Sequence, residues 1–590
     1  MLDWNRFFSL RSLVCLSVLL GTVSVASSQE AADSVAPEAA TSLQQAPVTS
    51  AKEFMVVAAN PYASMAGFEI LKAGGNAIDA MVAVQLTLGL VEPQSSGIGG
   101  GAFLMYYDAV AGEITSYDGR ETAPMAATPT LFQNDDGEPL KFWDAVVGGR
   151  SVGTPGTMRL IHDTHAKYGK LPWARVVEPA AILAQEGFEV SPRLNQLITR
   201  DKDRLSRFKS TQDYFFLEGK PLPVGHVLKN PAYAQTLIEV ANFGPDAFYK
   251  GKVAEDIVKT VQTAEGNPGV LALNDLANYH VIQRDPVCTS YEEYEVCGMG
   301  PPSSGALTVA QILGLTEPYD LESDAAKAAQ TWRVIGDASR LAFADRGRYM
   351  ADSDYVPMPT KGLVSEDYLD ERSVFLEGQT ALPQSEVVPG TPTWDHAMML
   401  ADDESIELPS TSHFSIVDAE GNVVSMTTTI ENGFGSRLMT NGFLLNNELT
   451  DFSFRTHKNG NPIANRVEPG KRPRSSMAPT IVMKDGKPFL AIGSPGGSRI
   501  IGYVATTLIA VLDWEMGLQE AIDMPHLVNR FGTYDLEKGT WAEELEAPLQ
   551  ELGYKTNIRD LNSGLHGIMI TPEGLIAGVD PRREGAAFGQ

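Results

Sequence analysis

The chain has little cysteine, little histidine and a shortage of positive charge. Its 590 residues include three cysteines and nine histidines, and 46 lysines and arginines stand against 74 aspartates and glutamates. The net charge of −28 makes a nucleic-acid partner unfavourable, because phosphate backbones are repelled by an acidic surface. No H-E-x-x-H zinc motif occurs, and His162 and His165 have no third ligand at metal-binding spacing. We therefore expect no nucleic-acid partner, no metal and no cofactor.

Long apolar runs are also scarce, and the clearest one lies at the start. Arg6 and Arg11 precede an apolar run from Leu13 to Ala26, which ends in small residues. This pattern is typical of a secretory signal peptide, predicted here over residues 1–26, and a periplasmic or secreted protein is expected. The run is short for a transmembrane helix, although a membrane anchor is the alternative. Residues 27–52 are rich in Ala, Ser, Gln, Glu and Pro, which predicts a disordered spacer.

Two cysteines remain after the predicted signal. Cys288 and Cys297 flank a stretch that is typical of a strand, a turn and a second strand. In an exported protein such a pair favours a disulfide that joins the two strands of a hairpin, and two free thiols are the alternative.

The order of the predicted elements points to an α+β fold. Apolar residues have helical spacing over 62–90, with a break at Gly74-Gly75, and strands follow at 103–117. Residues 155–350 are mostly helical, strands dominate from 411, and a helical stretch covers about 501–523. This order favours a layered α/β/β/α domain over a doubly wound parallel sheet.

The run Gly97-Ile-Gly-Gly-Gly-Ala102 resembles a loose dinucleotide-binding fingerprint. That fingerprint must open a helix, whose N-terminus holds the pyrophosphate, whereas residues 103–107 predict a strand. A tight turn with a close backbone approach is the better interpretation.

Thr411 marks the most informative boundary in the chain. A polar, Pro-rich stretch over about 383–410 gives way there to two alternating strands, 412–418 and 423–430. A turn centred near residue 420 places residue i opposite residue 840 − i, so that Thr411 faces Thr429. An N-terminal threonine carries its own base, since an α-amine has a pKa of about 7.7–8.0. We therefore predict cleavage of the Ser410–Thr411 bond, although threonine is also simply a good strand former.

Two downstream clusters could complete a site. The backbone amides of Gly496 and Gly497 have no side chains in their way and could form an oxyanion hole, or the pair could be a plain turn. Glu448 and Asp451 place two carboxylates three residues apart, on what could otherwise be a solvated loop.

Several segments, in this order along the chain, resemble those of the γ-glutamyltransferases, which are N-terminal-nucleophile hydrolases. The resemblance rests on six stretches, which are Val91–Gly101, Asp118–Pro124, Pro301–Gly305, Thr411–Ser415, Arg472–Met477 and Gly493–Arg499. It implies a four-layer αββα sandwich, built from a precursor that cuts itself into a large subunit, 53–410, and a small subunit, 411–590.

The resemblance also implies an activity and a set of site residues. The enzyme would transfer a γ-glutamyl group, typically from glutathione, to water or to an amino acid or peptide. Thr411 would be the nucleophile, with Thr429 supporting it and Gly496 and Gly497 forming the oxyanion hole. The implied substrate contacts are Arg120, Ser475 and Ser476 for the α-carboxylate and Glu448 and Asp451 for the α-ammonium.

Two departures from the family pattern stand out. The family often has asparagine two residues after the supporting threonine, where this chain has Glu431, which adds a third carboxylate to the expected ammonium site. No tyrosine lies between Asp451 and Ser475, so the aromatic lid of some relatives is not expected. An acylase of the same fold that acts on glutaryl cephalosporins is the closest alternative function, and a non-catalytic binding protein is another.

Overall fold

The computed structural model describes residues 37–41, 48–321, 326–396, 398–403, 405 and 407–590. The predicted signal peptide lies outside the described residues. Within the described residues, no helix is long and apolar enough to cross a lipid bilayer.

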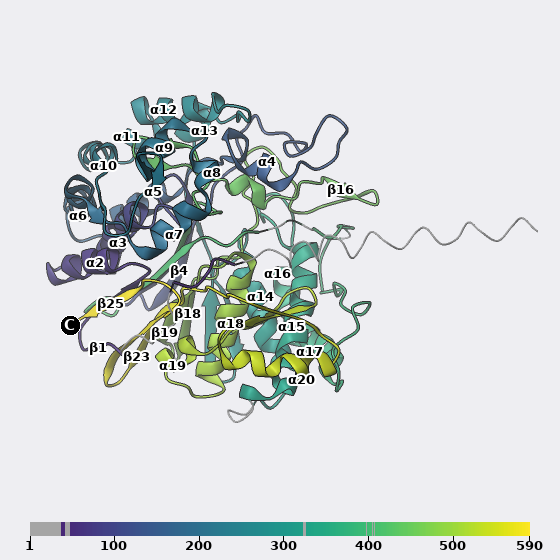
Figure 1. The fold of residues 1–590 in the computed structure, drawn as a ribbon. Helices are drawn as coiled ribbons and strands as arrows, with labels where there is room; N and C mark the ends of the chain where they lie inside the picture. The colour runs from purple at the N-terminus through teal and green to yellow at the C-terminus, as the bar shows by residue number, and fades with distance from the viewer. Residues whose placement is uncertain (1–36, 42–47, 322–325, 397, 404, 406) are drawn as a thin grey trace, which may run out of the picture.

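Two seven-stranded antiparallel sheets form the centre of the described structure (Figure 1). One has the strand order β25 (Ala586–Gly589), β2 (Met55–Ala58), β12 (Ser412–Val417), β13 (Val423–Thr429), β3 (Gly101–Asp108), β4 (Glu113–Gly119) and β9 (Ile282–Arg284). The other has the order β1 (Ser50–Ala51), β24 (Gly574–Val579), β23 (His566–Thr571), β19 (Lys487–Gly493), β18 (Thr480–Lys484), β11 (Tyr294–Gly298) and β10 (Val287–Tyr291).

Helices cover the outer face of each sheet. The first sheet is covered by α2 (Pro61–Lys72), α3 (Ala77–Val91) and α5 (Thr157–Tyr168), with α6 (Trp173–Glu186) and α10 (Pro231–Phe243) packed outside α3. The second is covered by α14 (Gly305–Thr316), α18 (Ile500–Leu512) and α19 (Leu518–Asp523), with α15 (Ala329–Tyr349) outside α14. The arrangement is the predicted four-layer αββα sandwich.

Smaller elements complete the described structure. The other helices are α4 (Phe142–Val146), α7 (Pro192–Arg200), α8 (Lys202–Leu205), α9 (Lys209–Phe215), α11 (Asp246–Tyr249), α12 (Gly251–Gln262), α13 (Leu273–Ala277), α16 (Thr360–Leu363), α17 (Glu366–Ser373) and α20 (Glu546–Glu551). A three-stranded sheet contains β20 (Leu527–Asn529), β21 (Thr533–Glu537) and β22 (Lys555–Arg559). Four short two-stranded pairs are also described, namely β5 (Phe188–Glu189) with β8 (Val227–Leu228), β6 (Phe216–Leu217) with β7 (Lys220–Pro221), β14 (Met439–Thr440) with β15 (Phe443–Leu444), and β16 (His457–Lys458) with β17 (Asn461–Pro462).

The layers follow from the alternation of side chains along the strands. In β2, Val56 and Ala58 pack against the helices, whereas Met55 and Val57 pack between the sheets, as a period of two requires. Helix α3 has every residue buried. It begins at the predicted Gly74-Gly75 break, where Asn76 and Asp79 form a reciprocal capping box that satisfies free amide groups of the first turn.

The hairpin that begins at Thr411 has the predicted register. Ser412 lies opposite Thr428, and Val417 lies opposite Val423. Strands β12 and β13 lie between β2 and β3, so segments from both sides of residue 411 alternate within one sheet. Pieces produced by a cut at this point would therefore stay hydrogen-bonded to each other over the length of several strands.

The N-terminal arm, residues 37–41, differs from the predicted spacer. Glu38 is buried and forms ion pairs with Arg193 and, at 3.5 Å, with Arg583. The amide of Thr41 donates to the carbonyl of Arg582 at 3.0 Å, and β1 adds Ser50–Ala51 to the edge of the second sheet. Composition indicated disorder here because the arm has few apolar residues, but it is held by charge and backbone pairing instead.

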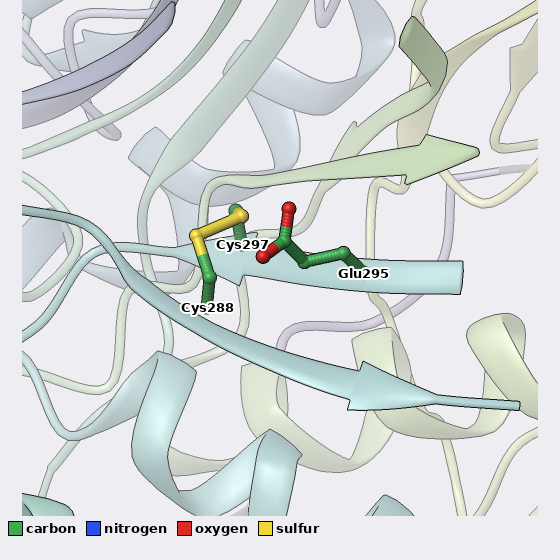
Figure 2. A group of neighbouring side chains, drawn as sticks. All are labelled: Cys288, Glu295 and Cys297. Carbon is green, nitrogen blue, oxygen red and sulfur yellow. A yellow bond between two sulfur atoms is a disulfide. The ribbon is translucent and has the colours of Figure 1, made fainter. Parts of the chain in front are cut away.

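Cys288 and Cys297 lie opposite each other on β10 and β11, and the structure joins their sulfurs in a disulfide (Figure 2). Their Cα atoms are 4.1 Å apart. Together with Glu295 they form the one group of described residues with the spacing of a metal site. Bonded sulfurs are not thiolate ligands, so this group does not indicate a metal site.

Replacing both Cys288 and Cys297 with serine is expected to lower the free energy of unfolding by about 2–3 kcal/mol, because the bond closes a short loop in the unfolded chain. Urea unfolding under oxidising conditions measures this difference. Ser290→Ala, an exposed change on the same strand, is the matched control and should cost less than about 0.5 kcal/mol. Equal stability of the double variant and the parent would contradict a disulfide in the protein.

Candidate active site

The glycine-rich run places the backbone of residues 99–101 against the Thr411 hairpin. It forms the turn between α3 and β3, as predicted, and opens no helix. A Cβ at Gly99 would lie 2.0 Å from the carbonyl oxygen of Leu444, and one at Gly100 would lie 2.0 Å from that of Thr429. No side chain fits at either position, so the run brings the α3–β3 turn against the end of β13.

Thr411 is buried and lies directly before β12, with its hydroxyl directed at the carbonyl group of Ser410. Its Oγ1 contacts the carbonyl oxygen of Ser410 and lies 3.2 Å from Oγ1 of Thr429. The Thr429 hydroxyl also donates to the Ser410 carbonyl oxygen, at 3.1 Å. The predicted pairing of the two threonines is therefore present, and both hydroxyls meet at one carbonyl group.

A buried charge network holds the backbone around Thr411. Arg583 donates to the Thr411 carbonyl oxygen at 2.8 Å, and Ser412 donates to Glu92 at 2.8 Å. Burial and the neighbouring Arg193 lower the pKa of Arg583 to about 10. Burial opposes ionisation of Glu38, but Arg193 and Arg583 hold its pKa below the usual range. The N-terminal arm thus supplies a countercharge to the arginine that binds the Thr411 carbonyl.

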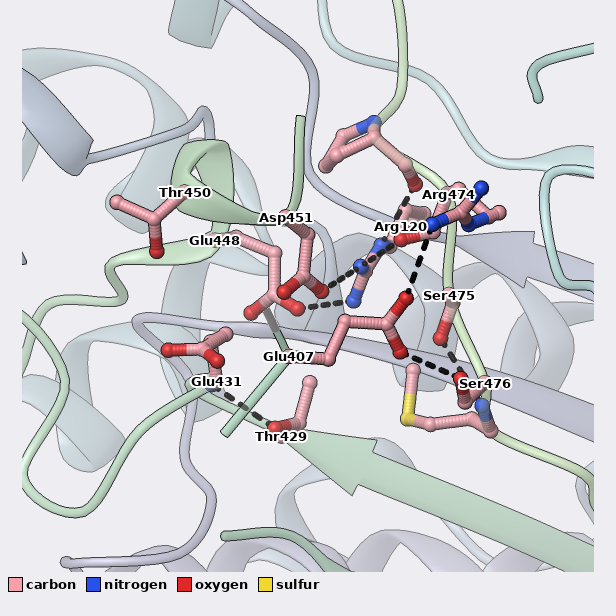
Figure 3. Close-up of polar contacts among 12 residues, drawn as sticks. Arg120, Glu407, Thr429, Glu431, Glu448, Thr450, Asp451, Arg474, Ser475 and Ser476 are labelled. Atoms are coloured by element: carbon pink, nitrogen blue, oxygen red, sulfur yellow. Dashed lines mark hydrogen bonds and ion pairs between the residues drawn. The ribbon is translucent and has the colours of Figure 1, made fainter. Parts of the chain in front are cut away.

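A second cluster joins the predicted substrate residues to one another (Figure 3). Arg120 forms a buried ion pair with Glu448 and another with Asp451, at 2.5 Å. It also donates to the carbonyl oxygens of Pro473, at 3.1 Å, and Arg474, at 2.9 Å. Burial works against the guanidinium charge, but the two carboxylates raise the pKa of Arg120. The groups predicted to bind opposite ends of a substrate are paired with each other in the uncut chain.

Glu407, four residues before Thr411, occupies the other predicted carboxylate contact. It accepts from Ser476 Oγ and pairs with Arg346 and, at 3.5 Å, with Arg474. Burial opposes its charge, yet the two arginines lower its pKa to about 2. The carboxylate of Glu407 therefore occupies the position on Ser476 where the α-carboxylate of a substrate is predicted to bind.

The extended segment 407–410, which precedes Thr411 and belongs to no sheet, lies in the cavity between these groups. The cavity is lined by Arg120, Glu407, Leu408, Ser410, Thr411, Thr429, Glu431, Glu448, Asp451, Ser475, Ser476, Met477, Gly497 and Ile500. It has a free volume of only about 20 Å³, which is room for about one water molecule. Small-molecule sites usually have volumes of about 300 Å³ or more, so the cavity admits a substrate only if residues 407–410 move out.

Comparison with known proteins assigns this arrangement to a family. Residues 63–590 match the family model of gamma-glutamyltranspeptidase. The chain belongs to the gamma-glutamyltranspeptidase family.

Named relatives of the family include two kinds of proenzyme. The chain is 36% identical to the glutathione hydrolase proenzyme of Bacillus subtilis strain 168, with 98% of each chain covered. It is 34% identical to the acylase ACY 1 proenzyme of Pseudomonas sp. strain SE83, over 89% of this chain and 91% of that one. Its fold resembles the crystal structure of a cephalosporin acylase from Bacillus halodurans, with a TM-score of 0.81, 26% identity and coverage of 93% and 97%.

Glu431, the departure from the common gamma-glutamyltranspeptidase pattern, lies in the cavity and does not turn away. Its carboxylate accepts from the backbone amide of Leu408 at 3.1 Å and from Asn447. Burial and the nearby Glu448 raise its pKa to about 8, which favours the protonated form of its side chain at neutral pH in the uncut chain. Its φ of 75° is in the left-handed region that asparagine adopts more readily than glutamate, which fits the asparagine common at this position.

The contribution of Glu431 to the stability of an uncut precursor is expected to fall as pH rises from about 5 to 8. The folded chain keeps a proton on Glu431 in this window, whereas the unfolded chain, with a pKa near 4.5, has lost it. Stability falls wherever the unfolded state binds fewer protons, by up to about 1.4 kcal/mol per pH unit for one group. Unfolding of a Thr411→Ala chain measures the slope of stability against pH, and adding Glu431→Gln should make that slope more positive. Equal slopes in the two chains would contradict the assignment to Glu431.

The glycine pair was expected to bind the carbonyl oxygen at the nucleophile, and Ser475 was expected to face the substrate site. Their contacts in the structure agree with these expectations only in part. Gly496 and Gly497 have φ values of 140° and 60°, and a Cβ on Gly497 would lie 2.8 Å from the Leu408 carbonyl oxygen. The Ser410 carbonyl oxygen itself is bound by the two threonine hydroxyls. Ser475 lines the cavity, and its Oγ accepts from the amide of Met477 at 3.1 Å. The oxyanion-hole role stays a prediction.

Sequence reasoning did not single out several charged residues of the site. Helix α15 contributes Arg346, the C-terminal segment contributes Arg583, and the segment 407–410 before Thr411 contributes Glu407. Glu121 is also buried beside the acidic cluster, and burial together with Glu448 raises its pKa well above the usual range. Arg474 and Glu121 lie within the runs around Ser475 and Arg120 that carry the family resemblance, so these runs were the available signal for them. Arg346 lies in no such run.

Two other sequence features have structural roles. His165 is buried and lies 3.1 Å from Asp79, so it supports the start of α3. Ser151, in the G-x-S-x-G run Gly149–Gly153, is buried and donates to the Val146 carbonyl oxygen at 2.7 Å. It does not stand on a strand-to-helix turn, as the nucleophile of a serine hydrolase would.

Proposed function

We propose that the protein is a γ-glutamyl-transferring hydrolase that cuts itself between Ser410 and Thr411 and then uses Thr411 as its nucleophile. The observation that carries the proposal is the contact of the Thr411 hydroxyl with the Ser410 carbonyl, supported by the Thr429 hydroxyl. Family membership supports it independently.

The proposed cut proceeds through an ester. Thr411 Oγ1 attacks the Ser410 carbonyl carbon, the peptide C–N bond breaks, and the hydroxyl proton passes to the departing nitrogen. The Thr429 hydroxyl, already bonded to the carbonyl oxygen, stabilises the negative charge that develops there. Water then hydrolyses the ester, which gives a carboxylate on Ser410 and a free amine and hydroxyl on Thr411.

In the cut enzyme the new amine is the base for the second reaction. It takes the Thr411 hydroxyl proton while the oxygen attacks the γ-carbonyl carbon of the substrate, and the proton passes to the departing amine. Water or the amine of an acceptor then cleaves the γ-glutamyl ester. We assign the substrate α-carboxylate to Arg120, Ser475 and Ser476, and the α-ammonium to the acidic residues Glu431, Glu448 and Asp451.

A comparison of two donors tests the proposal against the acylase alternative, which the similarity to acylases favours. Glutaryl-p-nitroanilide lacks the α-ammonium of γ-glutamyl-p-nitroanilide, and the buried acidic residues would have no partner in it. We expect kcat/KM to be at least about 100-fold higher for the γ-glutamyl donor, which corresponds to about 2.7 kcal/mol. A preference for the glutaryl donor would refute the proposal in favour of an acylase.

Export and the subunit boundaries are further parts of the proposal. The apolar start of the chain supports a cleaved signal, and the Cys288–Cys297 pair suits an oxidising compartment. The interleaved strands support two subunits, 53–410 and 411–590, that stay associated. Cell fractionation and N-terminal sequencing of both fragments test these points, and a fragment that does not begin at Thr411 would contradict them.

A further inference from the structure

The N-terminal arm is joined by two routes to the arginine that binds the Thr411 carbonyl oxygen. The direct route is the ion pair between Glu38, which is buried, and Nη2 of Arg583, at 3.5 Å. The indirect route passes through Asn562, which accepts from Nε of Arg583 at 3.1 Å and donates to the carbonyl oxygen of Ala39, also at 3.1 Å. The arm therefore engages two of the three nitrogens of this guanidinium group.

The third nitrogen, Nη1 of Arg583, donates to the carbonyl oxygen of Thr411 at 2.8 Å. The ladder of β12 with β13 begins at Ser412, and its ladder with β2 begins at Phe414. Thr411 lies just outside both ladders, where the arginine holds its backbone. This contact gains importance after the proposed cut, because Thr411 is then a chain end, and chain ends are poorly ordered unless they are tied down.

The buried charges around Arg583 depend on Glu38 for their balance. Arg193 pairs with Glu38 and lies 3.3 Å from Glu92. Burial raises the pKa of Glu92. Burial also opposes the charge of Glu38, but the two arginines hold its pKa below the usual range. Loss of the Glu38 charge would leave two buried guanidinium groups beside a carboxyl that favours its neutral form, and a buried charge without its partner is strongly unfavourable.

We propose that the N-terminal arm is a positioning element for both reactions of Thr411, with Glu38 acting through Arg583. Glu38 fixes the guanidinium, and the guanidinium fixes the backbone of the residue that attacks. Glu38 itself touches no reacting atom. Misplacing a reacting group by about 1 Å can cost about 100-fold in rate, even when the change lies far from the chemistry. This inference rests on the proposed γ-glutamyl-transferring function and adds a positioning group to the same site.

Glu38→Gln tests the inference, because it keeps the shape of the side chain and removes its charge. Pulse-labelling of the expressed chain gives the rate at which two fragments appear. The purified two-fragment enzyme gives kcat and KM for γ-glutamyl-p-nitroanilide. We expect self-cleavage and kcat each to fall about tenfold. The KM should stay unchanged, because Glu38 does not line the cavity of the predicted donor contacts.

Three further variants serve as controls. Glu38→Asp keeps the charge and should restore part of both rates. Asn562→Ala removes the indirect route and leaves the ion pair in place, so it should slow both reactions in the same direction even if Glu38→Gln fails to fold. Glu138→Gln removes an exposed carboxylate that pairs with Arg455, and should leave both rates unchanged.

The possible outcomes separate the inference from a structural effect and from the proposed function. A lower melting temperature of Glu38→Gln and Asn562→Ala, with self-cleavage and kcat as in the parent, would overturn the inference and leave the function in place. A raised KM with an unchanged kcat would also overturn it, since the arm would then act on donor binding. A parent chain that stays uncut and releases no nitroaniline would overturn the proposed function, and the inference with it.

Discussion

Replacing Thr411 with alanine is expected to leave the chain uncut and to lower γ-glutamyl-p-nitroanilide cleavage by at least about 10⁴-fold, the scale of nucleophile removal. The variant has no hydroxyl to attack the Ser410 carbonyl and, uncut, it exposes no amine to act as base. Residues 407–410 would also remain in the cavity. Gel electrophoresis and intact mass distinguish one full-length chain from two fragments.

Two further variants control for folding in this experiment. Thr411→Ser keeps the hydroxyl and should still give two fragments. Thr429→Ala removes one of the two hydroxyls at the Ser410 carbonyl, so cleavage should slow by about 10²–10³-fold, as for the loss of one oxyanion donor. An active, uncut Thr411→Ala protein would exclude Thr411 as the nucleophile of either reaction.

Arg120→Met is expected to destabilise the chain by about 3–5 kcal/mol, the usual cost of removing one partner from a buried ion pair. Glu448 and Asp451 would lose their shared countercharge in a site that also contains Glu431. Activity with the γ-glutamyl donor should fall as well, through a higher KM, because the α-carboxylate loses its proposed partner. Urea unfolding and initial rates measure the two effects separately.

The control for Arg120, whose ion pairs are buried, is an arginine whose ion pair is exposed to solvent. Arg455 is half exposed and pairs with the exposed Glu138, so Arg455→Met should cost less than about 1 kcal/mol. Arg120→Lys keeps the charge without the guanidinium fork, and should retain more stability than activity. A methionine variant as stable as the parent would show that the acidic residues do not depend on Arg120.

Much of the fold and the centre of the site could be predicted from local pattern. The break at Gly74-Gly75, the alternation after Thr411 and the turn near residue 420 each depend on neighbouring residues, and all three are present. The Thr411–Thr429 pair followed from them, because the register of a two-stranded hairpin is set by its turn. The four-layer architecture came from the resemblance, which the family comparison supports.

The state of the pocket could not be predicted in this way. The sequence pointed to Arg120, Glu448 and Asp451 as substrate contacts, but not to their pairing with one another in the uncut chain. It also gave no reason to place Glu407 on Ser476, or an arm near residue 38 against Arg583. Each of these contacts joins residues far apart in the chain, so no local spacing reports it.

The sequence by itself predicted a cut before Thr411 and Thr411 as the attacking residue, and it determined that Thr429 stands opposite Thr411 in the hairpin. Only the tertiary structure decided that the segment before the predicted cut lines the site, and that burial raises the pKa of Glu431 there. The physical reason is that backbone propensity and register act between neighbours along a strand. Burial, ion pairing and pKa depend instead on what other segments bring to the same place, and here those segments come from both sides of residue 411 and from both ends of the described chain.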